Sequence, residues 1–333
     1  MTLRFGLFGT GYWAAETQGA GLDGHPDAEF VGVWGRDPAK TEALARRYRV
    51  RPYADADDLI AAVDAIAVAL PPDIQAPLAI RAAESGRHLL LDKPVALDLP
   101  SADRLADAVR RAGVASLVFV TNRYRPEIEM FLDATVATGG WSGAQVTLLG
   151  SIFTPGGRYA GSSWRRRWGG LWDVGPHALS ILLPVLGPVV EVTAVHAPHD
   201  TVHAILRHTG PGDAATDNAA AGSGKAGSDG ASGGGAASGG GAVSTMSLTV
   251  NAPPAVSVQG TTFFGESGTV SLPVPEVASV DAFRTAVARL VGNVARGVPD
   301  DPLDVRSGRD AVAILAAAQK SADGGGVPQG VCY

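Results

Sequence analysis

The first 122 residues alternate short apolar stretches with segments of helical periodicity, and this alternation constrains the fold more than any other feature of the chain. The apolar stretches, bounded by Gly, Pro or Asp, cover residues 3–9, 29–35, 65–70, 88–92 and 116–121. The helical segments between them include residues 37–48, 75–86 and 100–113, with Asp37 and Ser101 as expected N-caps. Strands that alternate with helices predict βαβ units, so we expect an α/β domain with a doubly wound parallel sheet over residues 1–122.

The pattern changes after residue 122. Helical segments are expected near residues 127–138 and 174–186, and two more at about 279–296 and 305–321. Strand-like stretches cluster in between, at 144–153, 189–197, 201–208, 243–251, 255–265 and 269–274. Consecutive strands joined by turns predict a mostly antiparallel open sheet, so residues 123–333 are expected to form an α+β domain. Residues 210–242 are rich in Gly, Ser and Ala and are expected to be a disordered insertion without an assigned function.

Composition excludes several classes of function. A formal net charge of −6 argues against nucleic acid or an anionic membrane as partner. The single cysteine, Cys332, excludes a disulfide framework and a cysteine metal site. The N-terminal segment lacks the apolar core of a signal peptide, and no apolar run is long enough to span a bilayer, so a cytoplasmic protein is expected.

The first strand runs into "GTGYWA", residues 9–14, at the start of a helix. This is G-x-G-x-x-A, a form of the dinucleotide-binding fingerprint. Gly9 permits the tight turn, Gly11 lets the backbone approach a pyrophosphate, and Ala14 allows the helix to pack closely on the strand. A simple glycine turn is the alternative, but the position after the first strand of a βαβ array favours a dinucleotide site.

The end of the second strand bears on the choice of cofactor. NAD-specific sites usually place an acidic residue there, whereas this chain has "WGRD", residues 34–37. The Arg36 guanidinium can pair with a 2′-phosphate, which favours NADP over NAD. The alternative is a solvated Arg36 beside an Asp37 that only caps the helix.

Two further segments carry candidate chemistry. In "HLLLDKPVALD", residues 88–98, an apolar stretch typical of a buried strand is followed by Lys93. A charged side chain at the end of a core strand is unusual unless it has a function. "WRRRWGGLWDVGPHALS", residues 164–180, places Asp173 as a possible N-cap and His177 four residues later, where an imidazole suits proton exchange with a hydroxyl. A lysine extending to solvent, a capping aspartate and a helix-face histidine remain the structural alternatives.

Two clusters of side chains could suggest binding sites, but each has a structural interpretation that is at least as good. Four histidines within residues 196–208 lack an acidic cluster, so we expect strand-face or solvated histidines and no metal site. Arg165, followed by two further arginines between two tryptophans, is a candidate contact for an anionic substrate group, although a solvated basic turn is at least as good an interpretation.

Taken in order, "GTGYWA", "DKP" and "GGLWDVGPH" resemble the Gfo/Idh/MocA family of nicotinamide-dependent oxidoreductases over nearly the whole chain. The resemblance implies that Lys93 matches the lysine of the family's E-K-P motif and that Asp173 and His177 match its D-x-x-x-H pair, with the histidine as acid/base. "LPPDIQAPLA", 70–79, and "TNRYRP", 121–126, resemble the cofactor loop and the segment bordering the substrate site. Asp92 in place of Glu, and Ala76 in place of His, depart from the family pattern.

The resemblance therefore implies an oxidoreductase that transfers a hydride between nicotinamide and a sugar, polyol or related hydroxy or carbonyl compound. The expected catalytic residues are Lys93, Asp173 and His177, with Asp173 orienting the imidazole. The expected cofactor contacts are Gly9, Thr10, Gly11, Tyr12, Trp13, Arg36, Leu70, Pro71, Pro72, Asp92, Lys93 and Asn122. The expected substrate contacts are Lys93, Arg123, Tyr124, Arg165, Asp173 and His177.

Alternative functions are a non-catalytic sensor of a dinucleotide or sugar, and a glycosidase that uses bound nicotinamide transiently. The family resemblance also implies a homodimer or homotetramer formed through the sheet of the second domain.

Overall fold

The computed structural model describes residues 1–209, 241–256 and 258–333. The first domain contains a six-stranded parallel sheet in the order β3-β2-β1-β4-β5-β6. Its strands are β1 (Leu3–Phe8), β2 (Ala28–Trp34), β3 (Arg51–Tyr53), β4 (Ala65–Val68), β5 (His88–Asp92) and β6 (Ser116–Phe119). The π-helix η1 (Ala14–Gly19) and the short α1 (Ala20–Leu22) connect β1 with β2. Helices α2 (Pro38–Tyr48), α3 (Ala56–Ala62), α4 (Pro72–Glu84) and α5 (Leu99–Ala112) make the remaining connections, which confirms the expected doubly wound fold.

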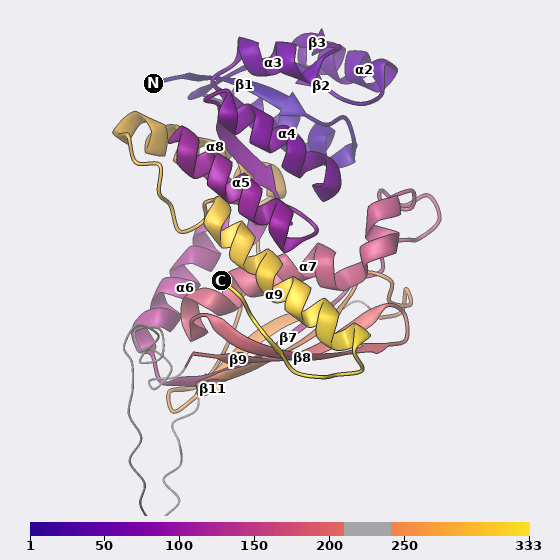
Figure 1. Cartoon of the computed structure of the whole chain (residues 1–333), viewed down its shortest axis with the longest axis vertical. Coiled ribbons are helices and arrows are strands. Elements are labelled where there is room, and N and C mark those ends of the chain that lie inside the picture. The colour runs from indigo at the N-terminus through magenta and orange to yellow at the C-terminus, as the bar shows by residue number, and fades with distance from the viewer. Residues whose placement is uncertain (210–240, 257) are drawn as a thin grey trace, which may run out of the picture.

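A seven-stranded mixed sheet, in the order β12-β11-β7-β10-β9-β8-β13, forms the second domain. Its strands are β7 (Trp141–Leu149), β8 (Val189–Ala197), β9 (Thr201–His208), β10 (Val243–Thr249), β11 (Val258–Gly265), β12 (Gly268–Ser271) and β13 (Gln329–Gly330). Neighbouring strands are antiparallel except β10 and β7, which pair in parallel, so the expected mostly antiparallel sheet is confirmed. Figure 1 shows α7 (Ser163–Leu186) and α9 (Val305–Asp323) lying over one face of this sheet.

Local sequence explains most helix boundaries. Helix α2 begins as expected, because the Asp37 carboxylate accepts hydrogen bonds from the amides of Ala39 and Lys40. Helix α5 differs, because its N-cap is Asp98, whose side chain accepts from the Ser101 amide. Ser101 is therefore a residue of the first turn and not the predicted cap. Helix α6 (Pro126–Thr138) begins near its expected position, after the short 3-10 helix η2 (Thr121–Tyr124).

The C-terminal helices connect the two domains. Phe283 of α8 (Ser279–Arg296) packs edge-on against Phe119 of the first domain, with 5.1 Å between ring centroids. Beyond α8, the Val118 amide of β6 donates to the Leu303 carbonyl at 2.7 Å. The boundary expected at residue 122 stays a prediction, and these contacts place residues of the last 55 positions against the first sheet.

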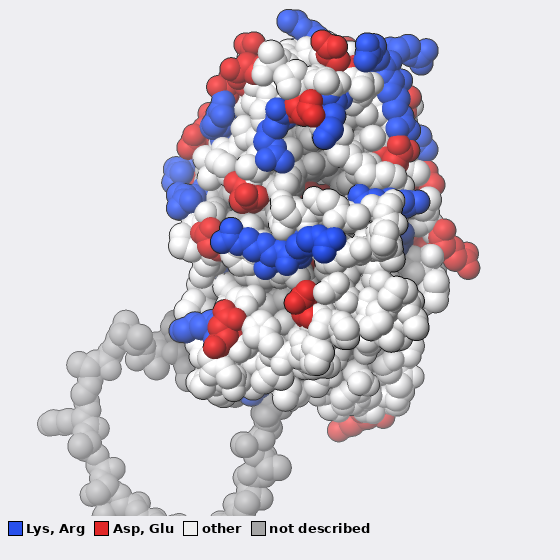
Figure 2. All heavy atoms as spheres, turned by 90° about the vertical axis from the view of Figure 1, so that its right-hand side faces the viewer, with Lys and Arg blue, Asp and Glu red and all other residues white. Residues whose placement is uncertain are grey.

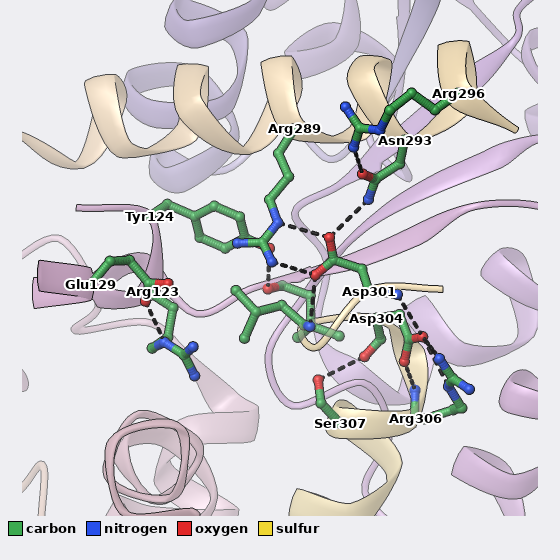
Figure 3. A network of polar contacts seen from close by, with 12 residues as sticks. Arg123, Tyr124, Glu129, Arg289, Asn293, Arg296, Asp301, Asp304, Arg306 and Ser307 are labelled. Carbon is green, nitrogen blue, oxygen red and sulfur yellow. Dashed lines mark hydrogen bonds and ion pairs between the residues drawn. The ribbon is translucent and has the colours of Figure 1, made fainter. Parts of the chain in front are cut away.

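A network of ion pairs fixes the α8–α9 connection (Figure 3). Arg289 donates two hydrogen bonds to the nine-tenths buried Asp301 carboxylate, at 2.8 and 2.7 Å, and Asn293 adds a third at 2.8 Å. These donors hold the pKa of Asp301 below its usual value against the opposing effect of burial, which is the largest single influence. The connection is thus held firmly against β6.

The expected disordered insertion at 210–242 lies outside the described residues, apart from 241 and 242. Among the helices that the structure describes, none is both long and apolar enough to cross a membrane.

Candidate active site

A cavity of about 610 Å³ lies at the carboxyl ends of β1, β2 and β4. Residues of the fingerprint line it together with Arg36, Leu70, Pro71, Asp92 and Lys93, and the segment from Arg158 to Arg165 closes its other side. Figure 2 shows this side of the molecule hollowed between the domains, with Lys and Arg side chains on both sides of the hollow. Open parallel sheets bind ligands at this edge, so this is the candidate dinucleotide site.

Glycine is required at positions 9 and 11 of the fingerprint for different structural reasons. Gly9 has a φ of 124°, and a Cβ there would lie 2.3 Å from the Ala69 carbonyl oxygen, so the fold itself requires glycine. A Cβ on Gly11 would meet no protein atom within 4 Å. The open space in front of Gly11 fits a pyrophosphate approaching the backbone, as the fingerprint predicts.

Lys93 directly follows the last residue of β5, at the start of a turn. The side chain of Gln75, which the sequence analysis did not single out, holds this turn by hydrogen bonds. Gln75 of α4 is fully buried; its Nε2 donates to the carbonyls of Asp92, at 2.8 Å, and Pro94, at 3.1 Å. Its Oε1 accepts from the Asp92 amide at 2.8 Å. The Lys93–Pro94 peptide bond in this turn is cis. Gln75 thereby sets the direction in which the Lys93 side chain leaves the strand.

We expect Gln75→Leu to lower the free energy of unfolding by about 2–4 kcal/mol, because buried amide and carbonyl groups at the turn lose their partners. Urea denaturation monitored by circular dichroism measures this change. Ser85→Ala, which removes one exposed hydrogen bond at the end of the same helix, is the matched control and is expected to change stability by less than about 0.5 kcal/mol. A Gln75→Leu protein as stable as the wild type would contradict this role.

A second cavity, of about 300 Å³, adjoins the nucleotide cavity and shares Trp13, Asp92, Lys93, Tyr159 and Arg165 with it. Asn122, Asp173, His177 and Gln259 are among its further polar lining residues. The two cavities meet at Lys93, so a ligand in the smaller one lies beside the end of the nucleotide site. The structure thus brings the lysine of the first domain and the histidine of the second to one cavity.

Asp173 holds two cations in this cavity. Lys93 Nζ donates to Asp173 Oδ1 at 2.9 Å and to the Asp173 main-chain carbonyl at 2.6 Å. Arg165 Nε donates to Asp173 Oδ2 at 2.9 Å. Lys93 and Arg165 hold the pKa of the Asp173 carboxyl at about 2 although burial, the largest single influence, acts to raise it. An ammonium has three donors, so one donor of Lys93 is left for a substrate oxygen.

This geometry corrects the expected role of Asp173. We predicted that Asp173 orients His177, but both of its carboxylate oxygens are engaged by Lys93 and Arg165. It is not an N-cap either, because α7 begins at Ser163 and is kinked at Gly169, where φ is 65°. Asp173 lies within the first turn after the kink, and its side chain is directed to the two cations instead of to the helix amides. It therefore positions the lysine.

His177 has no hydrogen bond from either ring nitrogen to a residue that the structure describes, so both nitrogens are available to a ligand in the cavity. Burial lowers the pKa of the imidazole to about 3, and the charges of Lys93, Arg125 and Arg165 act in the same direction. The ring is consequently neutral at pH 7, and the neutral imidazole is the form that can accept a proton.

Arg165 is fixed by aromatic side chains as well as by Asp173. Its guanidinium lies over the rings of Tyr159 and Trp164, 4.4 Å from each centroid. Tyr159 in turn contacts Tyr12 of the fingerprint edge-on, with 6.4 Å between ring centroids. The segment before α7 thus connects the nucleotide cavity with the Asp173 carboxylate.

The sequence profile of an oxidoreductase family with an NAD-binding Rossmann fold, GFO_IDH_MocA, matches residues 3–120. Residues 3–120 are therefore similar to the NAD-binding domain of this oxidoreductase family. Inositol 2-dehydrogenase of Rhizobium meliloti strain 1021 is 32% identical over 128 residues, which are 38% of each chain. Oxidoreductase ORF334 of Rhizobium meliloti is 32% identical over 155 residues, which are 46% of each chain. The chain thus aligns with less than half the length of these two curated relatives.

Solved structures with the same fold cover the whole chain. The WlbA dehydrogenase of Bordetella pertussis, in complex with NADH and UDP-GlcNAcA, superposes with a TM-score of 0.78, 23% identity and full coverage of both chains. Apo scyllo-inositol dehydrogenase of Lactobacillus casei has a TM-score of 0.78 at 14% identity and covers all of this chain and 99% of that one. At these identities the likeness shows the fold alone, and it extends over both domains.

Several residues that the family resemblance suggested lie away from the expected contacts. Tyr124 is buried in the core, where its hydroxyl donates to the Val118 carbonyl, so its expected substrate contact is wrong. Arg123 donates to Glu129 and to the Ser180 carbonyl and faces a separate apolar cavity. Pro72 is buried at the start of α4, and Asn122 lines the smaller cavity instead of the nucleotide cavity.

Three of the four histidines of residues 196–208 have separate side-chain partners. His196 pairs with Asp323, His203 with Ser247, and His208 with the Gly187 carbonyl and Ser244. Within the described part of the chain, no group of three or more His, Cys, Asp or Glu side chains is arranged to hold a metal ion.

Proposed function

We propose that this protein is an NAD(P)-dependent oxidoreductase of the Gfo/Idh/MocA family, which transfers a hydride between nicotinamide and a sugar, polyol or related hydroxy or carbonyl compound. The observation that carries the proposal is the shared lining of the two cavities, with Lys93 in both and His177 in the smaller one. The nicotinamide cofactor, when bound, supplies the hydride chemistry. The relatives named for inositol and the structure with UDP-GlcNAcA support a polyhydroxy substrate.

In the oxidation direction, His177 accepts the proton of the substrate hydroxyl, because its neutral imidazole has both nitrogens free of described protein partners. Lys93 stabilises the negative charge that develops on the same oxygen through its remaining donor. Asp173 holds the lysine in place, and Arg165 holds Asp173. In the reduction direction the roles reverse, with the imidazolium returning the proton.

The proposal includes a preference for NADP. Arg36 lines the nucleotide cavity, is exposed, and makes no hydrogen bond or ion pair with any residue in the described part of the chain. Lys40 lies in the same wall of the cavity and pairs with Asp37 Oδ2 at 3.5 Å, while Asp37 Oδ1 caps α2. Because Lys40 and the helix amides engage Asp37, the unpaired Arg36 guanidinium suits a 2′-phosphate better than a ribose hydroxyl.

We expect Arg36→Ala to raise the KM for NADP about 10-fold or more, through loss of a charge-assisted hydrogen bond, and to leave the KM for NAD within about threefold. Initial rates with each cofactor at saturating substrate measure the change. Arg46→Ala, in the last turn of α2, is the control. Equal effects on both cofactors, or a wild-type enzyme that prefers NAD, would contradict the NADP assignment.

A homodimer or homotetramer through the second sheet is also part of the proposal. Buried and exposed side chains alternate along the strands of this sheet, and Val195, Ile205, Val243 and Phe264 are among the exposed ones, with 41–52% of their surface accessible. A stripe of large apolar side chains across neighbouring strands is typical of a protein interface. We expect light scattering to give a multiple of 34.0 kDa for the wild type and a smaller mass for Ile205→Lys. A monomeric wild type at micromolar concentration, or an unchanged mass for the variant, would contradict this interface.

A further inference from the structure

The second domain contributes a cation to the nucleotide cavity that the sequence analysis did not single out. Arg158 lies between β7 and α7 and lines this cavity together with Gly11 and Tyr12 of the fingerprint. Its guanidinium lies over the Tyr12 ring, 4.6 Å from the ring centroid. Tyr12 directly follows Gly11 in the chain, so Arg158 lies at the part of the cavity that the fingerprint forms.

Arg158 has no carboxylate partner in the part of the chain that the structure describes. Most of the other cations that line the cavity have one: Lys40, Lys93 and Arg165. The remaining cation, Arg36, follows the end of β2, where we place the 2′-phosphate of NADP. Among the described residues, the cavity thus has two guanidinium groups without an ion pair, one from each domain.

The acidic residues that line the cavity are engaged by other groups. Asp37 pairs with Lys40 and caps α2. Asp92 Oδ1 accepts from the Lys93 amide at 2.8 Å. Burial raises the pKa of Asp92 to about 6, and the cations that oppose this rise are Lys93 and Arg165. Neither carboxylate therefore neutralises Arg158.

Glu16, in the helix that follows the fingerprint, is paired with another arginine. Both of its carboxylate oxygens accept hydrogen bonds from Arg47, one of them at 2.9 Å. The hydrogen bond from Arg47 is the main cause of the lowered pKa of Glu16, and the charge of Arg158 makes a smaller contribution. Since Glu16 and Arg47 balance each other, the charge of Arg158 is left for an anion in the cavity.

We propose that Arg158 binds the diphosphate of the dinucleotide cofactor from the side of the second domain. A Cβ on Gly11 would meet no protein atom within 4 Å, so there is room for the phosphates at the fingerprint. Amides at a helix N-terminus bind phosphate oxygens from one side, and a guanidinium adds charge-assisted hydrogen bonds from another. This inference rests on the proposed function, since it assigns a further cofactor contact at the same site.

A diphosphate held by Arg158 would also fix the segment that carries Arg165. The next residue, Tyr159, lies under the Arg165 guanidinium, 4.4 Å from ring centroid to Cζ, and contacts Tyr12 edge-on at 6.4 Å between ring centroids. Arg165 Nε in turn donates to Asp173 Oδ2 at 2.9 Å. We therefore expect bound cofactor to slow amide hydrogen exchange in residues 154–163.

Calorimetry on the full-length protein with NADPH, NADH and ADP-ribose tests the contact. All three ligands contain the diphosphate, whereas ADP-ribose lacks both the nicotinamide and the 2′-phosphate. We expect Arg158→Gln to weaken the binding of each ligand by about 10-fold, the size of one charge-assisted hydrogen bond. Arg158→Lys, which keeps the charge, should retain part of the affinity. Arg158 is exposed, so both variants are expected to fold as the wild type does.

Two further variants separate this contact from other effects of charge. Arg36→Ala is expected to weaken the binding of NADPH alone. Arg167→Gln removes an exposed arginine that lies over the Trp168 ring and does not line the nucleotide cavity, so all three affinities should stay within about twofold. Amide exchange in residues 154–163 at saturating NADPH should be slowed in the wild type and much less in Arg158→Gln.

The outcomes distinguish this inference from the proposed function. An unchanged affinity of Arg158→Gln for ADP-ribose, a loss confined to NADPH, or an equal loss in Arg167→Gln would overturn the inference, and so would equal protection of residues 154–163 in Arg158→Gln and the wild type. Hydride transfer by the wild type would leave the proposed function intact in each of these cases. Dinucleotide binding that depends on Arg158, without hydride transfer to any hydroxy or carbonyl compound, would contradict the proposed function alone.

Discussion

Replacing Lys93 by methionine is expected to lower the rate constant of hydride transfer by about 100- to 1,000-fold, the loss usual for one donor to a developing oxyanion. The ammonium is fixed by two hydrogen bonds to Asp173, so its remaining donor is preorganised toward the substrate oxygen. Single-turnover measurements of nicotinamide absorbance isolate this step. Because the nucleotide cavity has many other lining residues, we expect the dissociation constant of the cofactor to change less than about threefold.

A control variant and a stability measurement accompany this prediction. Lys320→Met, in the last turn of α9, removes a lysine far from either cavity and is expected to leave the rate unchanged. Asp173 keeps its hydrogen bond from Arg165 in the Lys93→Met protein, which should limit the loss of stability, and thermal unfolding with bound cofactor checks this. A folded Lys93→Met enzyme with the wild-type rate would remove the lysine from the chemistry.

Replacing His177 by alanine is expected to lower the same rate constant by about 100- to 10,000-fold, the range for loss of a general base. Because the pKa of the imidazole lies at about 3, the ring is neutral at pH 7. The rate of hydroxyl oxidation by the wild type should therefore stay level from pH 8 down to about pH 5. Carbonyl reduction needs the protonated ring, so its rate should rise as the pH falls over this range.

The lowered pKa of His177 also makes the stability of the fold depend on pH. A histidine pKa lowered in the folded state means that the unfolded chain binds more protons below pH 6.5, so this group destabilises the fold increasingly as the pH falls from 6.5 toward 3. His196→Ala, at an exposed ion pair with Asp323, is the control for both measurements. A rate of oxidation that falls with a midpoint near pH 6.5, and loses this midpoint in His177→Ala, would show that the ring titrates in its ordinary range.

The sequence predicted the layers of the fold because strand length and helical periodicity are local signals. It missed β3 and α3, since a strand of three residues, Arg51–Tyr53, leaves almost no periodicity to read. It also placed the start of α7 too late. Gly169 adopts φ of 65° inside that helix and marks a kink between two helical segments.

Within the candidate site, the motifs indicated Lys93 and His177, but partners chosen by tertiary packing were out of reach. The i, i+4 spacing of Asp173 and His177 suggested a pair, whereas the lysine arriving from β5 takes the carboxylate. Gln75 lies in an alanine-rich helix, and nothing local connects it with Asp92, 17 positions later.

The proposed hydride transfer requires Lys93 and His177 to act on one substrate oxygen beside the nicotinamide. A crystal structure with reduced cofactor and a tightly binding hydroxy compound tests this directly. We expect Lys93 Nζ and a His177 ring nitrogen each within about 3.2 Å of the same hydroxyl oxygen, and the attached carbon about 3–3.5 Å from nicotinamide C4. A hydroxyl that contacts neither residue, or a nicotinamide ring seated in the apolar cavity lined by Pro94 and Pro176, would contradict it.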